Sequence, residues 1–520
     1  MVATSGHDVL PVRSPIRLAA ALGSGLLLSG AFPPFDLGLL ALVALAPLLW
    51  CLRLGGARWG AACGVLAGLG FFGSLLSWSA TFGLVAYLPF VVVMSLYWGL
   101  CGAVCGWFAS RRCLNPWTAS AIWVLAEWLR ERWPWGGFSW GEVGYAFHDV
   151  AAARSVASLG GVLLLSFLAV LVNAVLVEAV LVEAVLVKAV SGRSVPPASR
   201  DSGARMRLWG CLAVVGAMLA VGAVLGPDAE GEGEGRLRVA VIQGNRYNRD
   251  PSPEELASRA LLRAHLQLTD TLSGPLDLVV LPEASLDDDP RRDPFLIEAL
   301  PQLARRLKAP VLANAQVDAP GGRALNTNFF YDDEGRLTGT YSKQFLVPFG
   351  EFVPLRNQLG FVSALQQVPR DYLPGPGRSL FPIGDTRFGS LICFESGVRS
   401  QARGYVREGA RLLVVSTNNR SFGRTSNSAQ HLALAQLRAA ETGRPVVQAG
   451  ISGPSALIDR SGRLLERTDL FELAVRVFET RPGNGTTVFV ALGDWIVVLA
   501  FGLAGLGMMR RVARRAPSDT

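Results

Sequence analysis

Long hydrophobic runs divide this chain into two kinds of sequence. Eight of them are long enough, or nearly so, to cross the apolar core of a bilayer as helices, at residues 17–33, 36–52, 58–79, 83–108, 115–130, 155–177, 207–226 and 487–509. Seven runs precede a long polar block and one follows it. The pattern therefore predicts a polytopic α-helical membrane domain of about eight transmembrane helices, interrupted by one polar domain.

These runs set the expected domain limits. We expect an N-terminal membrane domain of about seven transmembrane helices at 1–227, a polar domain at 228–486, and a final transmembrane helix with a basic tail at 487–520. Pro33-Pro34-Phe35-Asp36 joins the first two runs and predicts a tight turn. The sixth run continues into a five-residue tandem over 174–188, which we interpret as a helix extension without chemistry.

The polar block alternates short β-rich runs with helical patterns. Strands are expected at 237–242, 276–281, 309–314, 326–331, 337–342, 387–392, 411–416, 445–450 and 472–478. Ser252-Pro253-Glu254-Glu255 predicts a capped helix start, and Asp333-Glu334-Gly335 and Arg460-Ser461-Gly462 predict hairpin turns. Strands that alternate with helices favour a layered α/β sandwich.

Composition supports the membrane interpretation. Half of the 520 residues are hydrophobic and only 17% are charged, and the mean hydropathy is +0.34. The net charge is +8, but many arginines stand in short stretches beside the apolar runs, which is typical of membrane topology rather than of nucleic-acid binding. We therefore expect no nucleic-acid partner.

The loops between the runs alternate in charge. Basic residues fall in every second loop, at Arg13, Arg17, Arg53, Arg58, Arg111, Arg112, Lys188, Arg193, Arg200, Arg205, Arg207, Arg510, Arg511, Arg514 and Arg515. The loops near Pro33 and Thr81 carry no Lys or Arg, and the 130–154 loop is an imperfect fit. The positive-inside rule then places both termini in the cytoplasm and the polar block outside it, in the periplasm of a Gram-negative cell. Arg13 and Arg17 could also introduce a signal peptide, but seven further spans favour an uncleaved anchor.

Cysteine placement singles out one thiol. Six of the seven cysteines lie in or beside apolar runs, and Cys393 stands alone in the polar block. An unpaired thiol in an oxidising compartment points to a chemical role. A buried, inert cysteine is the alternative.

Three predicted strands end in residues suited to catalysis. Glu283 follows 278–281, Lys343 follows 337–342, and Cys393 follows 387–392. Strand ends of α/β sandwiches are where side chains converge on a site. Taken singly, Glu283 could cap a helix and Lys343 could lie at a solvated edge.

The order of these motifs resembles the nitrilase superfamily. Lys343-Gln-Phe-Leu-Val-Pro-Phe-Gly-Glu-Phe-Val-Pro354 lies between Leu-Pro-Glu283 and Ile-Cys393-Phe-Glu395. With spans on both sides of the domain, the whole chain resembles the apolipoprotein N-acyltransferases. Trp78, Glu127-Trp128-Leu129-Arg130 and Gly137-Phe138-Ser139-Trp140 add to that likeness in the membrane half.

The resemblance implies a fold and a reaction. The polar domain would be a nitrilase-like αββα sandwich in the periplasm, attached to the bacterial inner membrane. Cys393 would take an acyl chain from a phospholipid as a thioester and pass it to the amine of a diacylated apolipoprotein. Glu283 would be the general base, and Lys343 with the Phe394 backbone N–H would stabilise the oxyanion. A cation beside Cys393 would also lower the thiol pKa.

The resemblance implies further residues and partners. Glu351 and Glu395 would support the site, and no cofactor or metal is expected. The bilayer, the phospholipid donor and the apolipoprotein acceptor are the expected partners of a monomer. The apolar residues of 345–372 predict a lid against the bilayer, with Phe349, Phe352 and Trp140 on the substrate side. Core packing is the alternative for this segment.

Rival sites and departures from the family also appear. A Cys–His protease would need His265 or His431, and a metal site at Cys101 and Cys105 has no His or carboxylate nearby. A membrane-anchored amidase and a non-catalytic paralogue remain as alternatives. The family often has Tyr where Phe394 stands, a Trp near 246–249, and Ser-Asn-Asp-Ala-Trp-Phe-Gly where Thr417-Asn418-Asn419-Arg420-Ser421-Phe422-Gly423 stands.

Overall fold

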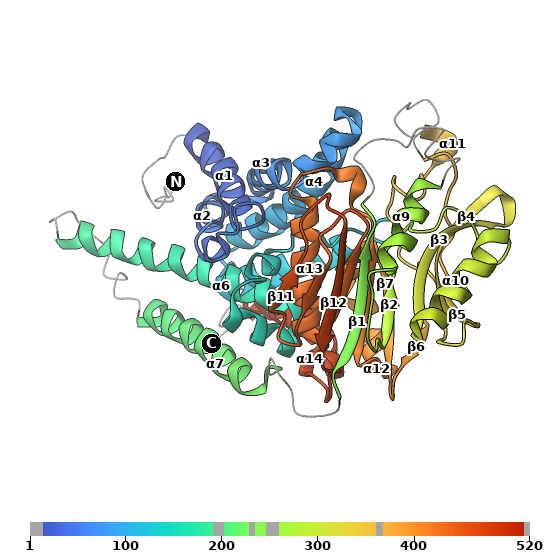
Figure 1. Ribbon diagram of the computed structural model, residues 1–520. Coiled ribbons are helices and arrows are strands. Elements are labelled where there is room, and N and C mark those ends of the chain that lie inside the picture. The colour runs from blue at the N-terminus through green and yellow to red at the C-terminus, as the bar shows by residue number, and fades with distance from the viewer. Residues whose placement is uncertain (1–13, 191–201, 228–234, 246–258, 360–367, 514–520) are drawn as a thin grey trace.

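The chain forms a helical half and a sheet half, seen side by side in the computed structural model (Figure 1). The structure describes residues 14–190, 202–227, 235–245, 259–359 and 368–513. We use "helical half" for the described residues before 228 together with those after 486, and "sheet half" for the described residues of 235–486. The division follows the two kinds of sequence pattern.

The described helices of the helical half overlap the hydrophobic runs, except for one short helix at Val143–Phe147. These are α1 (Ser14–Ser29), η1 (Gly38–Leu42), α2 (Ala46–Leu52), α3 (Ala57–Leu75), η2 (Ser77–Phe82), α4 (Leu84–Ser110), α5 (Pro116–Arg132), η3 (Val143–Phe147), α6 (Ala151–Val190), α7 (Ser202–Leu225), α14 (Val488–Leu492) and α15 (Trp495–Ala513).

Three of these runs are broken rather than straight. The second run forms the short elements η1 and α2, and the last run divides into α14 and α15 at Gly493, whose φ is +67°. Helix α6 kinks at Gly160 and Gly161, which have non-helical backbone angles. The tandem over 174–188 is helical, as expected, although the structure does not describe the side chains of 181–190. The breaks in the last run and in α6 fall at glycines, which permit backbone angles that end a helix. The second run breaks without a glycine, and α2 has a proline in its first turn.

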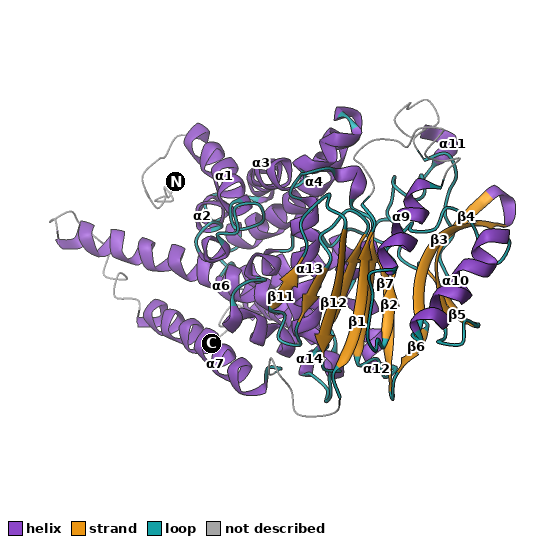
Figure 2. Cartoon of the chain, viewed as in Figure 1, coloured by secondary structure: helices purple, strands orange, loops and turns teal. Residues whose placement is uncertain are grey.

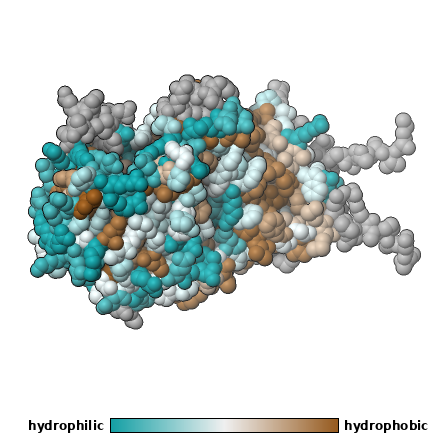
Figure 3. All heavy atoms as spheres, turned by 90° about the vertical axis from the view of Figure 1, so that its right-hand side faces the viewer, coloured by the Kyte–Doolittle hydropathy of each residue, from teal (hydrophilic) through white to brown (hydrophobic). Residues whose placement is uncertain are grey.

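Large aliphatic side chains are exposed on the helical half. Two described helices are long and apolar enough to cross a membrane by length and composition, Leu84–Ser110 and Ala151–Val180. Exposed residues of the first are Leu84, Val85, Leu88, Val92, Val93, Leu96 and Leu100. Figure 3 shows hydrophobic surface gathered toward one side of the molecule and hydrophilic surface toward the other. An extended apolar surface of this kind marks a contact with lipid or with another protein.

The sheet half contains two six-stranded sheets. The first has the order β12-β1-β2-β3-β4-β5 and the second β11-β10-β9-β8-β7-β6. Their strands are β1 (Leu237–Gln243), β2 (Leu278–Val280), β3 (Val311–Ala319), β4 (Arg323–Tyr331), β5 (Leu337–Ser342), β6 (Leu380–Ile383), β7 (Thr386–Ile392), β8 (Leu412–Thr417), β9 (Val446–Gly450), β10 (Ala456–Ile458), β11 (Leu464–Arg467) and β12 (Ala474–Thr480).

Strand β1 shows how the layers form. Leu237, Val239 and Val241 belong to a hydrophobic cluster that includes the second sheet, whereas Ala240 and Ile242 belong to a cluster with α9 and α10. Alternate side chains of a strand face opposite sides of its sheet. Helices α9 (Ala260–Thr269) and α10 (Pro294–Leu307) thus pack on one sheet, and α12 (Arg399–Arg407) and α13 (Asn427–Thr442) on the other. Figure 2 shows the strands between flanking helices, which confirms the layered α/β sandwich.

Most local predictions for this half are confirmed. Every expected strand is present, and the two predicted hairpin turns join β4 to β5 and β10 to β11. Gly335 and Gly462 each have a φ of +81° in these turns. The strands β6, β10 and β11 were missed because they are only three or four residues long. The predicted helix start at 252–255 lies outside the described residues.

The two halves share one hydrophobic cluster. Phe394, Val398, Leu434, Leu437 and Ala440 of the sheet half are buried within the cluster that fills the helical half. Burial of this kind is the main favourable contribution to association between packed units. The sheet half therefore packs directly against the helices through a shared hydrophobic core.

Candidate active site

The three residues singled out at strand ends lie together. Glu283 comes shortly after β2, Lys343 directly after β5, and Cys393 directly after β7. The Glu283 carboxylate and the Lys343 ammonium each interact electrostatically with the Cys393 thiol and with one another. Glu283 and Lys343 are buried, and Cys393 is half-buried. The fold thus brings a carboxylate, an ammonium and a thiol from two sheets into one site.

Glu351 fixes the ammonium of Lys343. Lys343 Nζ donates a hydrogen bond of 2.8 Å to Glu351 Oε1, and the Val347 N–H donates one of 2.8 Å to Oε2 of the same carboxylate. Glu351 therefore holds both the Lys343 side chain and the loop that follows it. Charge-assisted contacts of this kind are stronger than neutral hydrogen bonds.

A set of buried asparagines orients Glu283. Asn326 Nδ2 donates to Glu283 Oε1 at 2.7 Å. Asn314 Nδ2 donates to Asn326 Oδ1 at 2.9 Å and to Asn328 Oδ1 at 2.8 Å. Sequence reasoning missed these residues. The available signal was polar Asn326 and Asn328 on one face of an otherwise buried strand, where a buried amide must find partners.

The surroundings shift the pKa values of the two charged groups upward. Burial raises the pKa of Glu283, although the Lys343 ammonium opposes the shift. Burial would lower the pKa of Lys343, but the carboxylates of Glu351 and Glu283 outweigh it, so the net shift is upward. Lys343 accordingly stays charged, and Glu283 accepts a proton more readily than an exposed carboxylate does.

The Cys393 thiol is protonated at rest. Burial, followed by the Glu283 carboxylate, raises its pKa to about 12, and Lys343 acts in the opposite direction. The expected lowering by a nearby cation is thus present but outweighed, because the thiol also faces a carboxylate in a buried site. A protonated thiol that is to act as a nucleophile needs a base, and the Glu283 carboxylate is close enough to interact with it electrostatically.

A tight turn carries Cys393. We call Cys393–Gly397, the element η7, the cysteine turn. Cys393 has a φ of +51°, a strained conformation for a residue with a side chain. The buried Glu395 carboxylate accepts hydrogen bonds from the Ile392 N–H at 2.8 Å, the Gln344 N–H at 2.8 Å and the Tyr341 hydroxyl at 2.7 Å. Glu395 therefore ties this turn to the segment that follows Lys343.

The histidines of the sheet half contact the backbone. His431 Nε2 lies 3.0 Å from the Cys393 carbonyl oxygen and 2.8 Å from Ser396 Oγ. His265 Nδ1 lies 2.8 Å from the Leu261 carbonyl oxygen, and its Nε2 accepts from the Gly244 N–H at 3.3 Å. Burial lowers the pKa of each to about 4. His431 therefore supports the cysteine turn as a neutral ring, which argues against a Cys–His protease site.

The aromatic residues expected near substrate lie in two places. The Phe394 ring stacks on Phe138, with centroids 5.8 Å apart. Trp140 is buried behind the cysteine turn, where its Nε1 donates to Gln430 Oε1 at 2.7 Å. Phe349 is 43% exposed, and Phe352 is half-buried. Of the expected lid, residues 360–367 lie outside the described part of the chain.

Metal ligands are not grouped in the described residues. Among them, no cluster of three or more His, Cys, Asp or Glu side chains could hold a metal ion. The site's charges come from its own side chains.

Comparisons with known proteins find similar sequences for both the helical half and the sheet half. The family model for the apolipoprotein N-acyltransferase N-terminal domain matches residues 24–175, and the carbon-nitrogen hydrolase model matches 238–483. The apolipoprotein N-acyltransferase of Geobacter metallireducens is 30% identical over 98% of this chain and 97% of its own length. That of Azotobacter vinelandii is 32% identical over 95% of each. Among solved structures, a mutant of the Nesterenkonia AN1 amidase from the nitrilase superfamily matches with a TM-score of 0.34 and 17% identity, covering 46% of this chain and 89% of that one.

Proposed function

Since this chain belongs to the apolipoprotein N-acyltransferase family, we propose that it uses Cys393 to move an acyl chain from a phospholipid to the amine of a diacylated apolipoprotein. Membership rests on relatives at least 30% identical over nearly the full length, so the chain is a membrane-associated acyltransferase. The observation that carries the mechanism is the convergence of Glu283, Lys343 and Cys393 from three strand ends, where the three groups interact electrostatically.

The first step loads the enzyme. Glu283 takes the proton of the Cys393 thiol as sulfur attacks the ester carbonyl of the phospholipid. Lys343 and the Phe394 backbone N–H stabilise the negative charge that forms on the carbonyl oxygen. The carbon–oxygen ester bond then breaks, the departing alcohol takes the proton from Glu283, and lysophospholipid leaves a thioester on Cys393.

The second step transfers the acyl chain from Cys393 to the apolipoprotein. The α-amine of the apolipoprotein attacks the thioester carbonyl, and Glu283 takes a proton from that amine. The carbon–sulfur bond breaks as the amide bond forms, and the proton returns to the Cys393 sulfur. The mechanism is ping-pong and balances without a metal or nucleotide. The carboxylates of Glu283 and Glu351 together carry two negative charges beside the single ammonium of Lys343. Because this excess favours binding of a proton, it supports Glu283 as the group that exchanges protons.

The proposed topology places the sheet half in the periplasm. We assign a membrane domain to 1–227, the catalytic domain to 228–486, and a last transmembrane helix with a cytoplasmic tail to 487–520, about eight spans in all. Basic loops on one side and exposed aliphatic residues on α4 support this arrangement. A reporter that works only in the periplasm should be active when fused after Gly235. A silent reporter there, with an active one at the C-terminus, would reverse the topology.

The decisive test removes the thiol. In a strain depleted of its own N-acyltransferase, Cys393→Ala should abolish triacylation of a lipoprotein, and Cys393→Ser should leave at most a trace because a hydroxyl ionises far less readily. Cys113→Ala, at a half-buried thiol after α4, is the matched control and should retain activity. Triacylation by Cys393→Ala would exclude the thioester. Release of free acid without transfer to the amine would favour an amidase, and an inactive wild-type chain would favour a non-catalytic paralogue.

A further inference from the structure

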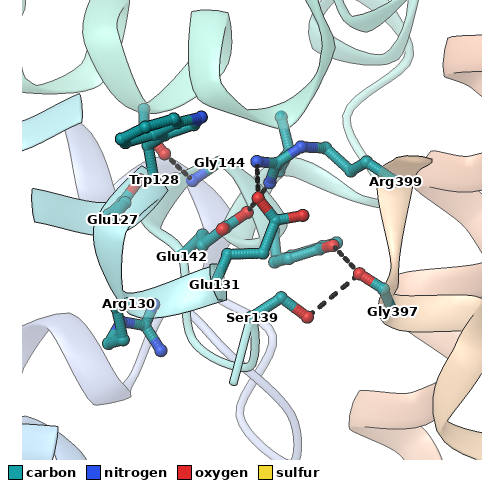
Figure 4. A network of polar contacts seen from close by, with 12 residues as sticks. Glu127, Trp128, Arg130, Glu131, Ser139, Glu142, Gly144, Gly397 and Arg399 are labelled. Atoms are coloured by element: carbon teal, nitrogen blue, oxygen red, sulfur yellow. Dashed lines mark hydrogen bonds and ion pairs between the residues drawn. The ribbon is translucent and has the colours of Figure 1, made fainter. Parts of the chain in front are cut away.

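Two motifs of the helical half have no role in the mechanism above. Glu127-Trp128-Leu129-Arg130 lies in α5, and Gly137-Phe138-Ser139-Trp140 follows that helix. We call residues 127–145 the clamp segment. Figure 4 shows that Glu131, Ser139 and Glu142 of this segment lie beside Gly397 and Arg399. The segment thus meets the sheet half just beyond Cys393.

The clamp segment binds the last residue of the cysteine turn. The Gly397 carbonyl oxygen accepts a hydrogen bond from Ser139 Oγ at 2.9 Å and another from the Tyr145 hydroxyl at 3.4 Å (Figure 4). The rings of Phe138 and Phe394 stack beside it, with an interplanar angle of 12°. Two residues of the turn are therefore held by side chains of the helical half.

A buried ion-pair group fastens the helix that follows the turn. Arg399 is the first residue of α12 and is 1% exposed. Its Nη1 donates to Glu142 at 2.6 Å and its Nη2 to Glu131 (Figure 4). Both carboxylates are buried and both belong to the clamp segment. A guanidinium that bridges two buried carboxylates sets both position and orientation.

The beginning and the end of the cysteine turn are thus held by different halves. Glu395 and His431 hold its start within the sheet half. Ser139 holds its end, and the pairs of Arg399 hold the helix beyond it. Cys393 has a strained φ of +51°, and such a conformation persists only where its surroundings determine it fully.

We propose that the clamp segment positions Cys393 for attack, with Ser139 and Arg399 as positioning residues. The helical half then completes the active site in addition to holding it at the membrane. This inference rests on the proposed role of Cys393 as the nucleophile. A small displacement of a reacting group is enough to slow an enzyme considerably, so loosening the end of the turn should reduce turnover.

The main test compares two buried serines in purified full-length protein. Ser139→Ala should lower kcat by roughly tenfold or more, with little change in the KM for phospholipid. Ser139→Thr, which keeps the hydroxyl, should restore most of the activity. Ser166→Ala is the matched control, because Ser166 Oγ accepts from the Gly144 N–H at 2.9 Å and lies in the same network without touching the cysteine turn. It should keep kcat near wild type.

Thiol reactivity gives a second readout that needs no turnover. Iodoacetamide labelling, followed by mass spectrometry of the peptide that contains Cys393, should slow in Ser139→Ala because the displaced thiol loses Glu283 as its base. Ser166→Ala should label at the wild-type rate. Since labelling is independent of acyl transfer, it distinguishes failure of this inference from failure of the proposed function.

Arg399 supplies an independent variant. Arg399→Lys keeps the positive charge but loses the planar guanidinium that bridges the two carboxylates. It should lower kcat and the rate of Cys393 labelling together. Wild-type kcat and labelling in both Ser139→Ala and Arg399→Lys would overturn the proposal. So would an equal loss in Ser166→Ala at the same fraction of folded protein. If Arg399→Lys does not fold, the serine comparison decides.

Discussion

Buried charges occur in two regions of this molecule, and they are arranged differently. In the catalytic centre, the Lys343 ammonium lies between the carboxylates of Glu351 and Glu283, beside a thiol. At the junction of the halves, the Arg399 guanidinium lies between Glu142 and Glu131. Glu131 has a second cationic partner in Arg132.

The difference lies in the partners of the buried carboxylates. Burial raises the pKa of Glu283 and also those of Glu131 and Glu142. The two junction carboxylates face arginine, which stays protonated in proteins and holds carboxylates in a fixed bidentate geometry. Glu283 instead faces the Cys393 thiol, a second group that can gain and lose a proton. One set of buried charges is therefore suited to chemistry and the other to position, although both place carboxylates around a buried cation.

The largest expected effect follows from removing the base. Glu283→Gln keeps the size of the side chain but cannot take the thiol proton, so acyl loading of Cys393 should fall by roughly 10²–10⁴-fold. Mass spectrometry of the acylated Cys393 peptide measures this step directly. Loading within about tenfold of wild type would exclude Glu283 as the base and would remove the distinction between the two regions.

Loss of the central ammonium should have the next largest effect. Lys343→Met should lower kcat by roughly 10²–10³-fold, because the oxyanion loses a donor in a buried site. The side chain is only 1% exposed, so Lys343→Arg should not restore activity in a space that fits lysine. Steady-state kinetics with a long-chain phospholipid would show the change, and full activity of Lys343→Met would contradict the assignment.

The pH dependence of activity distinguishes the two regions by means of a substitution that lies outside the candidate active site. Because the pKa of Glu283 is raised above its ordinary value, activity should be present above that raised pKa and should fall about tenfold per pH unit below it. Glu142→Gln, at the junction, should leave the position of this pH profile unchanged. A profile that shifts in Glu142→Gln would mean that the junction also exchanges protons during turnover.

The two variants Glu142→Gln and Glu283→Gln should rank in opposite orders for loss of stability and for loss of activity. Glu142→Gln removes one partner of the buried Arg399 and should lower the free energy of unfolding by about 1–3 kcal/mol. Glu283→Gln should cost less, because the amide oxygen can still accept the hydrogen bond from Asn326 and Lys343 keeps its hydrogen bond to Glu351. Thermal unfolding of both variants in detergent would rank them. A larger loss in Glu283→Gln would reverse the comparison.

The smallest expected effect concerns the exposed edge of the site. If the segment 345–372 forms a lid against the bilayer, Phe349→Asp should fold normally but load long-chain phospholipid several-fold more slowly, since a charge in the apolar region is unfavourable. Access of a small thiol reagent to Cys393 should not change. Unfolded protein from both Phe349→Asp and Phe352→Asp would identify these residues as core, and full activity of both would exclude the lid.

Local sequence patterns predicted the parts of the site that depend on strand ends. Glu283, Lys343 and Cys393 each follow a strand, so their convergence could be expected from an α/β sandwich. The contact of Ser139 with Gly397 joins residues 258 positions apart, and no periodicity relates them. Asn326 was missed for a similar reason, because its partner Glu283 follows another strand, 43 positions earlier in the chain. Short strands such as β10 were missed because three residues carry no recognisable alternation.

The shared hydrophobic cluster determines how the protein can be assembled during synthesis. Helices α1 to α7 leave the ribosome before the sheet half, and α15 emerges last. Phe394 and Leu437 are buried in a cluster that contains residues of both groups of helices, and the Trp495 indole of α15 donates to the Leu159 carbonyl of α6 at 2.7 Å. A newly made sheet half therefore lacks its final support until the membrane segments are in place. The sheet half can therefore reach its final packing only after both groups of helices are present.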